Sequence, residues 1–346
     1  MQPYTDSRQQ GLKSLVTGGA GFIGSHVVDE LVAAGHDVVV LDDLSGGFAD
    51  NVNSAAEFVE GSVTDDSLVE KLYARHKFDY VFHLAAYAAE GLSHFIRRFN
   101  YTNNLVGSVT LMNAAVRHGC RCFVFTSSIA VYGAGQVPMD ESMTPEPEDP
   151  YGIAKYAVEM DLAAARRLFD LNYIVFRPHN VYGERQNLGD KYRNVIGIYM
   201  NSVMQGLPCT IFGDGKQTRA FTHIADIAPA IARSVTIPEA SGQVFNIGAD
   251  TPYSVAELAE MVQKAMGRQT GIRHLEARKE VLHAHSDHSK ARRILGCAGA
   301  ITLEQGLARM AEWAWRVGPR SSREFEGIEV ERGLPSGWVK PECTKA

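Results

Sequence analysis

Ser128, Tyr151 and Lys155 have the side chains and the spacing to carry acid–base chemistry on an alcohol. Tyr151 and Lys155 are four residues apart, so on a helix they lie on the same face. An ammonium group near a phenol favours the phenolate and lowers a pKa that is normally about 10, which would make Tyr151 a usable base near neutral pH. Ser128 follows an expected strand at 122–126, and α/β sheets place their sites at that end of a strand. For the Tyr–Lys pair alone, a solvated helical face is the alternative interpretation.

A glycine-rich segment near the N-terminus has the pattern of a dinucleotide-binding turn. Gly18, Gly21 and Gly24 lie between an expected strand at 14–17 and an expected helix at 22–34. The first glycine permits a tight turn, the second lets the backbone approach a pyrophosphate, and the third allows close packing of helix and strand. The phosphates would then sit at the helix N-terminus. Without this context, the same pattern is an ordinary surface turn.

An acidic residue at the end of the next expected strand, 37–41, indicates which dinucleotide binds. Asp42 follows Gly24 by 18 residues. A carboxylate there accepts hydrogen bonds from the ribose hydroxyls of adenosine and repels a 2′-phosphate. The sequence therefore favours NAD over NADP, with a simple strand-end cap as the alternative role of Asp42.

The elements that must position these groups alternate along the first half of the chain. Strands followed by helices predict βαβ units and a parallel sheet, and the near-continuous apolar strands fit burial on both faces. We therefore predict an α/β fold with a Rossmann-type, doubly wound parallel sheet and a smaller C-terminal substrate lobe. Ser254 and Glu257 have the spacing of a capping box at the start of a late helix. The further strands are expected at 58–59, 80–84, 122–126, 173–177 and 244–247, and the further helices at 103–118, 151–169, 194–204 and 254–266.

The composition limits the class of protein. The 346 residues include 34 Lys and Arg against 40 Asp and Glu, and 45% of the residues are apolar, which is ordinary for a globular enzyme. The net charge of −6 argues against general binding to nucleic acid or to an acidic membrane. No apolar run reaches the ~18 residues of a membrane span. The five cysteines lack the spacing of a metal site, so we expect reduced thiols, no metal and a cytoplasmic location.

Taken together, the motifs resemble the extended short-chain dehydrogenase/reductase family. Within it, the chain is most similar to the NAD-dependent nucleotide-sugar epimerases, such as those that interconvert UDP-glucose and UDP-galactose. The resemblance extends from about residue 13 to 315. It rests on the three glycines, Asp42, His83-Leu-Ala-Ala86, Ser127-Ser128-x-x-Val-Tyr-Gly133 and Tyr151-x-x-x-Lys155.

The resemblance implies roles for individual residues. It implies a catalytic triad of Ser128, Tyr151 and Lys155. The NAD contacts that it implies are Gly18, Gly21, Phe22, Ile23, Gly24, Asp42, Asp43, Leu44, Ser62, Val63, Leu84, Ala85, Ala86, Asn104, Tyr151, Lys155, Pro178 and His179. The UDP-sugar contacts that it implies are Ser128, Tyr151, Asn180, Asn194, Phe212, Arg219, Arg278 and Glu280, with Glu280 in place of the usual Asp at the uridine ribose.

The reaction implied is 4-epimerisation of a UDP-hexose. Tyr151 would remove the proton of the sugar 4-hydroxyl while NAD accepts the hydride from C4, and the 4-keto sugar would then turn before the hydride returns. Related dehydratases and decarboxylases carry acids where this chain has Ile129 and Ala130. Neither side chain can move a proton, so elimination and decarboxylation lack their acid.

Several alternatives stay open at this point. Arg185 could face a uronate carboxylate, which would suit UDP-glucuronate, or it could make a phosphate or surface contact. Ala284 falls where these epimerases control access for the 2-substituent of the sugar, so UDP-N-acetylglucosamine is a second alternative. A non-catalytic, dinucleotide-sensing protein is the rival class, although the intact Ser–Tyr–Lys set speaks against it. A homodimer through the helices near 100–118 and 151–169 is expected, with small residues such as Ala154 and Ala165 allowing close approach.

The expected domain organisation follows from the strand–helix alternation, whose regularity ends after Arg177. Residues 1–178 would form the NAD-binding Rossmann domain, with later crossover segments near 223–250. Residues 179–330 would form mainly the nucleotide-sugar lobe, and 331–346 a tail.

Overall fold

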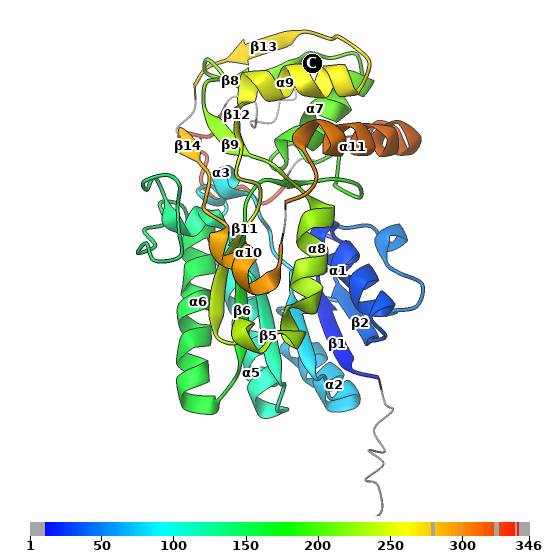
Figure 1. Cartoon of the computed structure of the whole chain (residues 1–346), viewed down its shortest axis with the longest axis vertical. Coiled ribbons are helices and arrows are strands. Elements are labelled where there is room, and N and C mark those ends of the chain that lie inside the picture. Colours follow the sequence, from blue (N-terminus) through cyan, green and yellow to red (C-terminus); the bar gives the residue numbers. More distant parts are fainter. Residues whose placement is uncertain (1–10, 278–280, 298, 322–324, 336–337, 339–346) are drawn as a thin grey trace, which may run out of the picture.

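The computed structural model describes residues 11–277, 281–297, 299–321, 325–335 and 338. A seven-stranded parallel sheet forms the centre of the larger lobe, and a smaller lobe lies beyond the carboxyl ends of its strands (Figure 1). The strand order is β11-β6-β5-β4-β1-β2-β3. The strands are β1 (Lys13–Thr17), β2 (Asp37–Asp42), β3 (Glu57–Glu60), β4 (Tyr80–His83), β5 (Cys122–Thr126), β6 (Tyr173–Pro178) and β11 (Gln243–Ile247).

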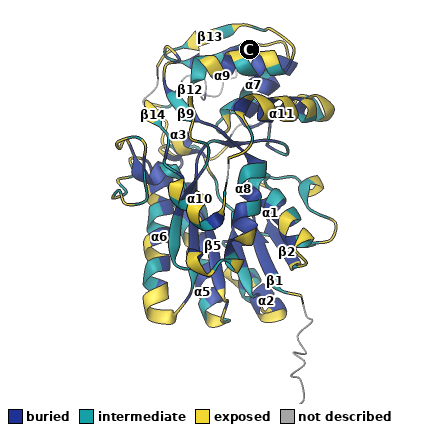
Figure 2. Ribbon diagram, viewed as in Figure 1, coloured by how far each residue is buried: buried dark blue, intermediate teal, exposed yellow. Residues whose placement is uncertain are grey.

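Alternation along each strand divides the core into two clusters. Leu15 and Val39 lie in the cluster on one face of the sheet, whereas Val16, Val38 and Val40 lie in the cluster on the other face. This is the period of two that a strand imposes on its side chains. Apart from the edge strand β3, the strands are accordingly buried along most of their length (Figure 2).

Helices cover both faces, which confirms the predicted doubly wound α/β fold. One set packs in the cluster that contains Val16, and the other packs in the cluster that contains Leu15. The first set consists of α1 (Phe22–Ala33), α8 (Ile224–Arg233) and α10 (Ser289–Leu295). The second set consists of α2 (Asp66–His76), α5 (Gly107–Arg117) and α6 (Pro150–Phe169).

The helix expected at 103–118 begins earlier and is irregular. It starts as α4 (Arg97–Tyr101), continues through a π-helical stretch (Thr102–Val106) and ends as α5. Asn100 lies inside this run and is buried, and its side chain donates to the carbonyl oxygen of Pro150, 2.8 Å away. That contact is tertiary, so the local pattern of apolar residues does not show it.

The smaller lobe is built around its own apolar cluster, which includes Tyr199, Leu258 and Met310. Its helices are α7 (Val195–Met204), α9 (Val255–Ala265) and α11 (Leu303–Val317), and its strands include β8 (Cys209–Phe212), β9 (Thr218–Ala220), β12 (Pro252–Ser254), β13 (Ile272–Leu275) and β14 (His283–Ala284). The chain also returns twice to the larger lobe, once through α8 and β11 and once through α10. The predicted capping box at Ser254 and Glu257 is present at the start of α9.

Two expectations from the composition bear on these described residues. No helix among them is both long and apolar enough to cross a membrane. The thiols of Cys120, Cys122, Cys209 and Cys297 are free, whereas Cys343 lies outside the described residues.

Candidate active site

A single large cleft at the carboxyl ends of the strands brings most of the predicted residues together. Its volume is about 2160 Å³, whereas a site for one small molecule typically measures about 300–1,000 Å³. The cleft therefore has room for a dinucleotide and a second ligand side by side. The predicted residues that line it are Gly18, Gly21, Phe22, Ile23, Gly24, Asp42, Asp43, Val63, Leu84, Ala85, Ala86, Ser128, Tyr151, Lys155, Pro178, His179, Asn180, Asn194, Phe212 and Arg219.

The turn between β1 and α1 has the geometry of a phosphate cradle. Gly18 has a φ of +73°, and a Cβ there would lie 2.7 Å from the backbone nitrogen of Ala85. A side chain at Gly24 would overlap the carbonyl oxygen of Gly18. No other residue type fits these two positions without moving the backbone. The open N-terminus of α1 therefore faces the cleft, where its N–H groups can bind a pyrophosphate.

Asp42 links the end of β2 to this turn. One carboxylate oxygen accepts from the backbone N–H of Ala20 at 3.0 Å, and the other accepts from that of Leu44 at 2.8 Å. Burial raises the pKa of Asp42, and these two hydrogen bonds oppose the rise. The carboxylate has about four acceptor sites, so it can still accept from a ribose hydroxyl. The turn and the carboxylate thus fit the pyrophosphate and the adenosine ribose of NAD.

Ser128 and Tyr151 meet beyond the end of β5. Ser128 caps a short 3₁₀ helix (Ile129–Tyr132), where its hydroxyl oxygen accepts from the backbone N–H of Ala130. Tyr151 lies in the first turn of α6, whose N-terminus is capped by Asp149. A side-chain hydrogen bond joins Tyr151 to Ser128. A substrate hydroxyl at this point would therefore contact both side chains.

Lys155 lies one turn further along α6 and is fully buried. Its Nζ donates to the carbonyl oxygen of Thr126 at 2.8 Å and lies 5.8 Å from the ring centroid of Tyr151. Burial lowers the pKa of Lys155 to about 7, and Glu159 partly opposes this shift. The ammonium is thus held at the strand end and is close to losing its proton at neutral pH.

The pKa of Tyr151 departs from the expectation based on its spacing to Lys155. Burial raises this pKa well above its usual value, and the negative charges of Asp149 and Glu90 raise it further. The hydrogen bond from Ser128 and the charge of Arg193 oppose the rise. Desolvation disfavours the phenolate more strongly than the nearby groups favour it. The protein side chains alone therefore leave Tyr151 as a neutral phenol.

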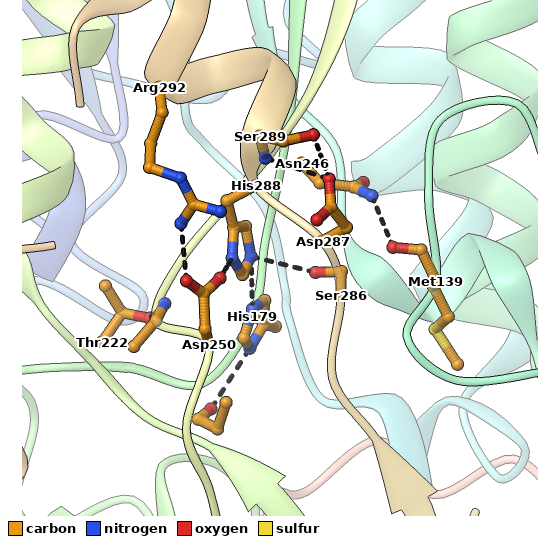
Figure 3. A network of polar contacts seen from close by, with 12 residues as sticks. Met139, His179, Thr222, Asn246, Asp250, Ser286, Asp287, His288, Ser289 and Arg292 are labelled. Atoms are coloured by element: carbon orange, nitrogen blue, oxygen red, sulfur yellow. Dashed lines mark hydrogen bonds and ion pairs between the residues drawn. The ribbon is translucent and has the colours of Figure 1, made fainter. Parts of the chain in front are cut away.

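His179 is held in the cleft wall by a buried polar network (Figure 3). One ring nitrogen lies 3.1 Å from the carbonyl oxygen of Ala220, and the other lies 2.9 Å from Nε2 of His288. His288 contacts Asp250 at 2.6 Å, and Arg292 pairs with the same carboxylate. Burial lowers the pKa of His179 to about 3. The ring is therefore neutral and does not repel a cation at the place where the resemblance puts the nicotinamide.

Three predicted NAD contacts do not lie on the cleft wall. Asn104 is buried and bonds the backbone of Tyr87, its Oδ1 accepting at 2.8 Å and its Nδ2 donating at 3.1 Å. It therefore positions Tyr87, which lines the cleft, and does not itself face the cavity. Ser62 is engaged with the hydroxyl of Thr64 at 2.9 Å. Leu44 contributes only its backbone N–H, to Asp42.

Arg185 also lies away from the cleft wall. Its guanidinium pairs with Asp29 of α1 at 2.7 Å. The structure therefore supports the surface contact as the role of Arg185. It does not support a contact with a uronate carboxylate in the cleft. Arg278 and Glu280 lie outside the described residues.

The nucleotide-sugar side of the cleft contains cations that the motifs did not single out. Lys191 and Arg193 line the cleft immediately before α7, whose N-terminal residues Asn194 and Val195 also line it. A helix N-terminus with adjacent cations suits a second pyrophosphate. In the sequence, the two basic residues just before the expected helix at 194–204 are the signal that could have identified this part of the site. Arg219 lines the cleft too, although it donates to the carbonyl oxygens of residues 218, 281 and 282.

The fold and this site define a Rossmann-type enzyme with a dinucleotide cradle beside a Ser–Tyr–Lys set. Residues 14–248 match the NAD dependent epimerase/dehydratase family, and the chain belongs to that family. Its cofactor is NAD, for which the glycine turn and Asp42 supply the fit described above.

Known relatives make the likeness more specific. The UDP-glucose 4-epimerase of Mycolicibacterium smegmatis is 37% identical over 310 residues, which span 87% of this chain and 98% of the relative. The structure of the Thermotoga maritima UDP-glucose 4-epimerase with UDP-glucose has a TM-score of 0.85 at 35% identity, covering 88% of this chain and 99% of that one. The Thermus thermophilus UDP-glucose 4-epimerase in complex with NAD has a TM-score of 0.83 at 28% identity, covering 87% and 98%.

Proposed function

We propose that this chain is an NAD-dependent 4-epimerase that interconverts UDP-glucose and UDP-galactose through a 4-keto sugar. The observation that carries the proposal is the hydrogen-bonded pair of Tyr151 and Ser128, with Lys155 behind it, in one cleft with the NAD cradle. The relatives from Mycolicibacterium smegmatis and Thermotoga maritima, both UDP-glucose 4-epimerases, support the same substrate.

Each catalytic residue of the cleft has a separate role in the reaction. Tyr151 takes the proton of the sugar 4-hydroxyl, and the hydroxyl of Ser128 holds the same oxygen in place. When bound, NAD supplies the acceptor for the hydride of C4 and a positively charged nicotinamide ring. A positive charge beside a phenol lowers its pKa, which offsets the effect of burial on Tyr151. Lys155 donates to the carbonyl oxygen of Thr126 and so holds α6 against the end of β5.

The cleft wall beside the triad supports epimerisation over elimination. Ile129 and Ala130 both line the cleft next to Ser128. They are the positions at which related dehydratases and decarboxylases carry acids. With apolar side chains there, the keto sugar keeps its substituents and can only receive its hydride back.

The proposal is tested by NMR on purified protein with UDP-galactose and no added cofactor. The expected result is conversion to an equilibrium mixture with UDP-glucose, together with NAD released from the protein on denaturation. Protein that carries NAD but leaves both sugars unchanged would favour the dinucleotide-sensing class instead. NADP in place of NAD would contradict the role of Asp42.

The breadth of sugar acceptance is expected to depend on Ala284. This residue lies on β14, pairs with Arg219 of β9 and lines the cleft. Because its methyl group leaves room near the sugar, UDP-N-acetylglucosamine is expected to react beside UDP-glucose. Ala284→Tyr should lower the rate ratio of the N-acetyl sugar to UDP-glucose. An unchanged ratio, or wild-type protein inert toward the N-acetyl sugar, would rule Ala284 out as the determinant.

We also propose a cytoplasmic homodimer. The alanines expected to allow close approach, Ala154 and Ala165, are instead buried within the chain. The exposed apolar side chains on the same helices include Val106, Ile153 and Met160, which are 53%, 39% and 52% exposed, and Leu168 and Phe169 at the end of α6. Light scattering at micromolar concentration should give a dimer, and Met160→Glu should shift it toward the monomer. A wild-type monomer would refute this assembly.

A further inference from the structure

The chain continues beyond α11 and returns to the larger lobe. We call its described part, residues 318–321, 325–335 and 338, the C-terminal strap. The backbone of Arg320 exchanges hydrogen bonds with the side chain of Asn201 on α7. The carboxylate of Glu329 accepts the backbone N–H groups of Arg98 and Phe99, both at 2.8 Å, at the start of α4. The strap thus connects the two lobes beside the cleft.

Aromatic contacts hold the strap in place. The ring of Phe325 lies 4.9 Å from that of Phe99 and 5.3 Å from that of Tyr87. Trp338 is only 8% exposed, and its ring lies 5.3 Å from that of Tyr192. Tyr87 and Tyr192 both line the cleft. The strap is therefore packed against two parts of the cleft wall.

The strap also faces the cavity directly. Gly333, Leu334, Pro335 and Trp338 are among the lining residues of the cleft. A Cβ added at Gly91 would lie 3.3 Å from the ring of Trp338, and Gly91 adjoins Glu90 on α3 (Glu90–Ser93). Glu90 and Gly91 also line the cleft, so Trp338 packs against α3 at the cleft wall.

We propose that the C-terminal strap is part of the substrate site and that Leu334 and Trp338 form its outer wall, which retains the 4-keto sugar during turnover. This inference rests on the proposed function. The keto sugar must turn inside the cleft, so the site cannot grip the hexose tightly. An apolar wall restrains the ring without fixing its orientation and excludes water. If the keto sugar leaves, the hydride of C4 stays on the cofactor, and that protein molecule holds reduced NADH.

The test compares wild type with Trp338→Ala, Leu334→Ala and a chain that ends at Gly318. Val330→Ala is the matched control, because Val330 belongs to the strap but is 42% exposed and is not among the cleft-lining residues. The readouts are the KM for UDP-glucose and the absorbance of protein-bound NADH at about 340 nm during turnover. Total NAD content and the unfolding midpoint establish that each variant is folded.

The expected result is a KM raised by roughly tenfold in Trp338→Ala, because tryptophans are enriched among the few side chains that dominate the energy of a binding site. NADH should accumulate in the two point variants and the shortened chain, but not in wild type or Val330→Ala. Folded Trp338→Ala and Leu334→Ala with wild-type KM and no NADH would overturn the inference while leaving the proposed function intact. If wild type fails to epimerise, the proposed function is wrong. In that case the Kd for UDP-glucose tests the strap by itself, and equal Kd values in wild type and both point variants would overturn its role in the substrate site.

Discussion

Replacing Tyr151 with phenylalanine is expected to lower epimerase turnover by roughly 10²–10⁴-fold, the usual effect of removing a general base. The hydroxyl of Tyr151 is the atom that bonds Ser128 and that would take the proton of the sugar. Phenylalanine fills the same buried space, and Lys155 keeps its bond to Thr126. The fold and the bound NAD should therefore be unchanged. Turnover is measured by NMR, and NAD content by absorbance after denaturation.

Tyr156→Phe is the matched control for this experiment. Tyr156 lies on the same helix and packs in a small cluster with Val131 and Met139, but it is not among the residues that line the cleft. It is expected to retain wild-type turnover. Near wild-type turnover in Tyr151→Phe would remove this residue from the role of base, whatever the control shows.

Glu159→Gln is expected to destabilise the protein by about 3–5 kcal/mol, the usual cost of breaking a buried ion pair from one side. Both carboxylate oxygens of Glu159 accept from Arg177 of β6, at 3.0 and 2.5 Å, and one also accepts from Ser127 at 2.5 Å. The side chains of Glu159 and Arg177 are each 5% exposed. Loss of the carboxylate charge leaves a buried guanidinium without its counterion. The free energy of unfolding is obtained from denaturant titration.

Two further variants separate the pair from the helix that carries it. Asp161→Asn removes an exposed charge from the same helix and should change the free energy of unfolding by less than about 0.5 kcal/mol. The double variant Glu159→Leu with Arg177→Met removes both buried charges and should cost less than the single change. A single variant as stable as wild type would show that this ion pair does not hold α6 against β6.

The features that the sequence predicts well depend on neighbouring residues. The capping box at Ser254 and Glu257 involves four consecutive positions, and the structure contains it as predicted. The strand–turn–helix around Gly18 follows from a glycine pattern whose packing needs are local. For the same reason, the near-continuous apolar residues of β1 and β2 were sufficient to predict a sheet buried on both faces.

The features that the sequence did not predict depend on contacts between distant residues. Arg185 pairs with Asp29, and Glu329 caps α4 from 231 residues away in the sequence. The pKa of Tyr151 is set by how completely the fold buries it, which the spacing to Lys155 does not reveal. The apolar residues of the strap follow neither a helix nor a strand periodicity, so the sequence did not indicate where the strap packs.

The position of β11 in the sheet has a consequence for the synthesis of the chain. β11 pairs with β6, but Gln243 follows Pro178 by 65 residues. At about 5–20 residues per second, a ribosome needs roughly 3–13 s to make that length. During this time β6, which contains Ile174 and Phe176, is an apolar edge strand. Its backbone N–H and C=O groups are unpaired on one side, and such an edge can pair with a strand of another chain. A chain that ends at Pro178 should therefore aggregate, and slow translation between these strands should lower the yield of soluble protein.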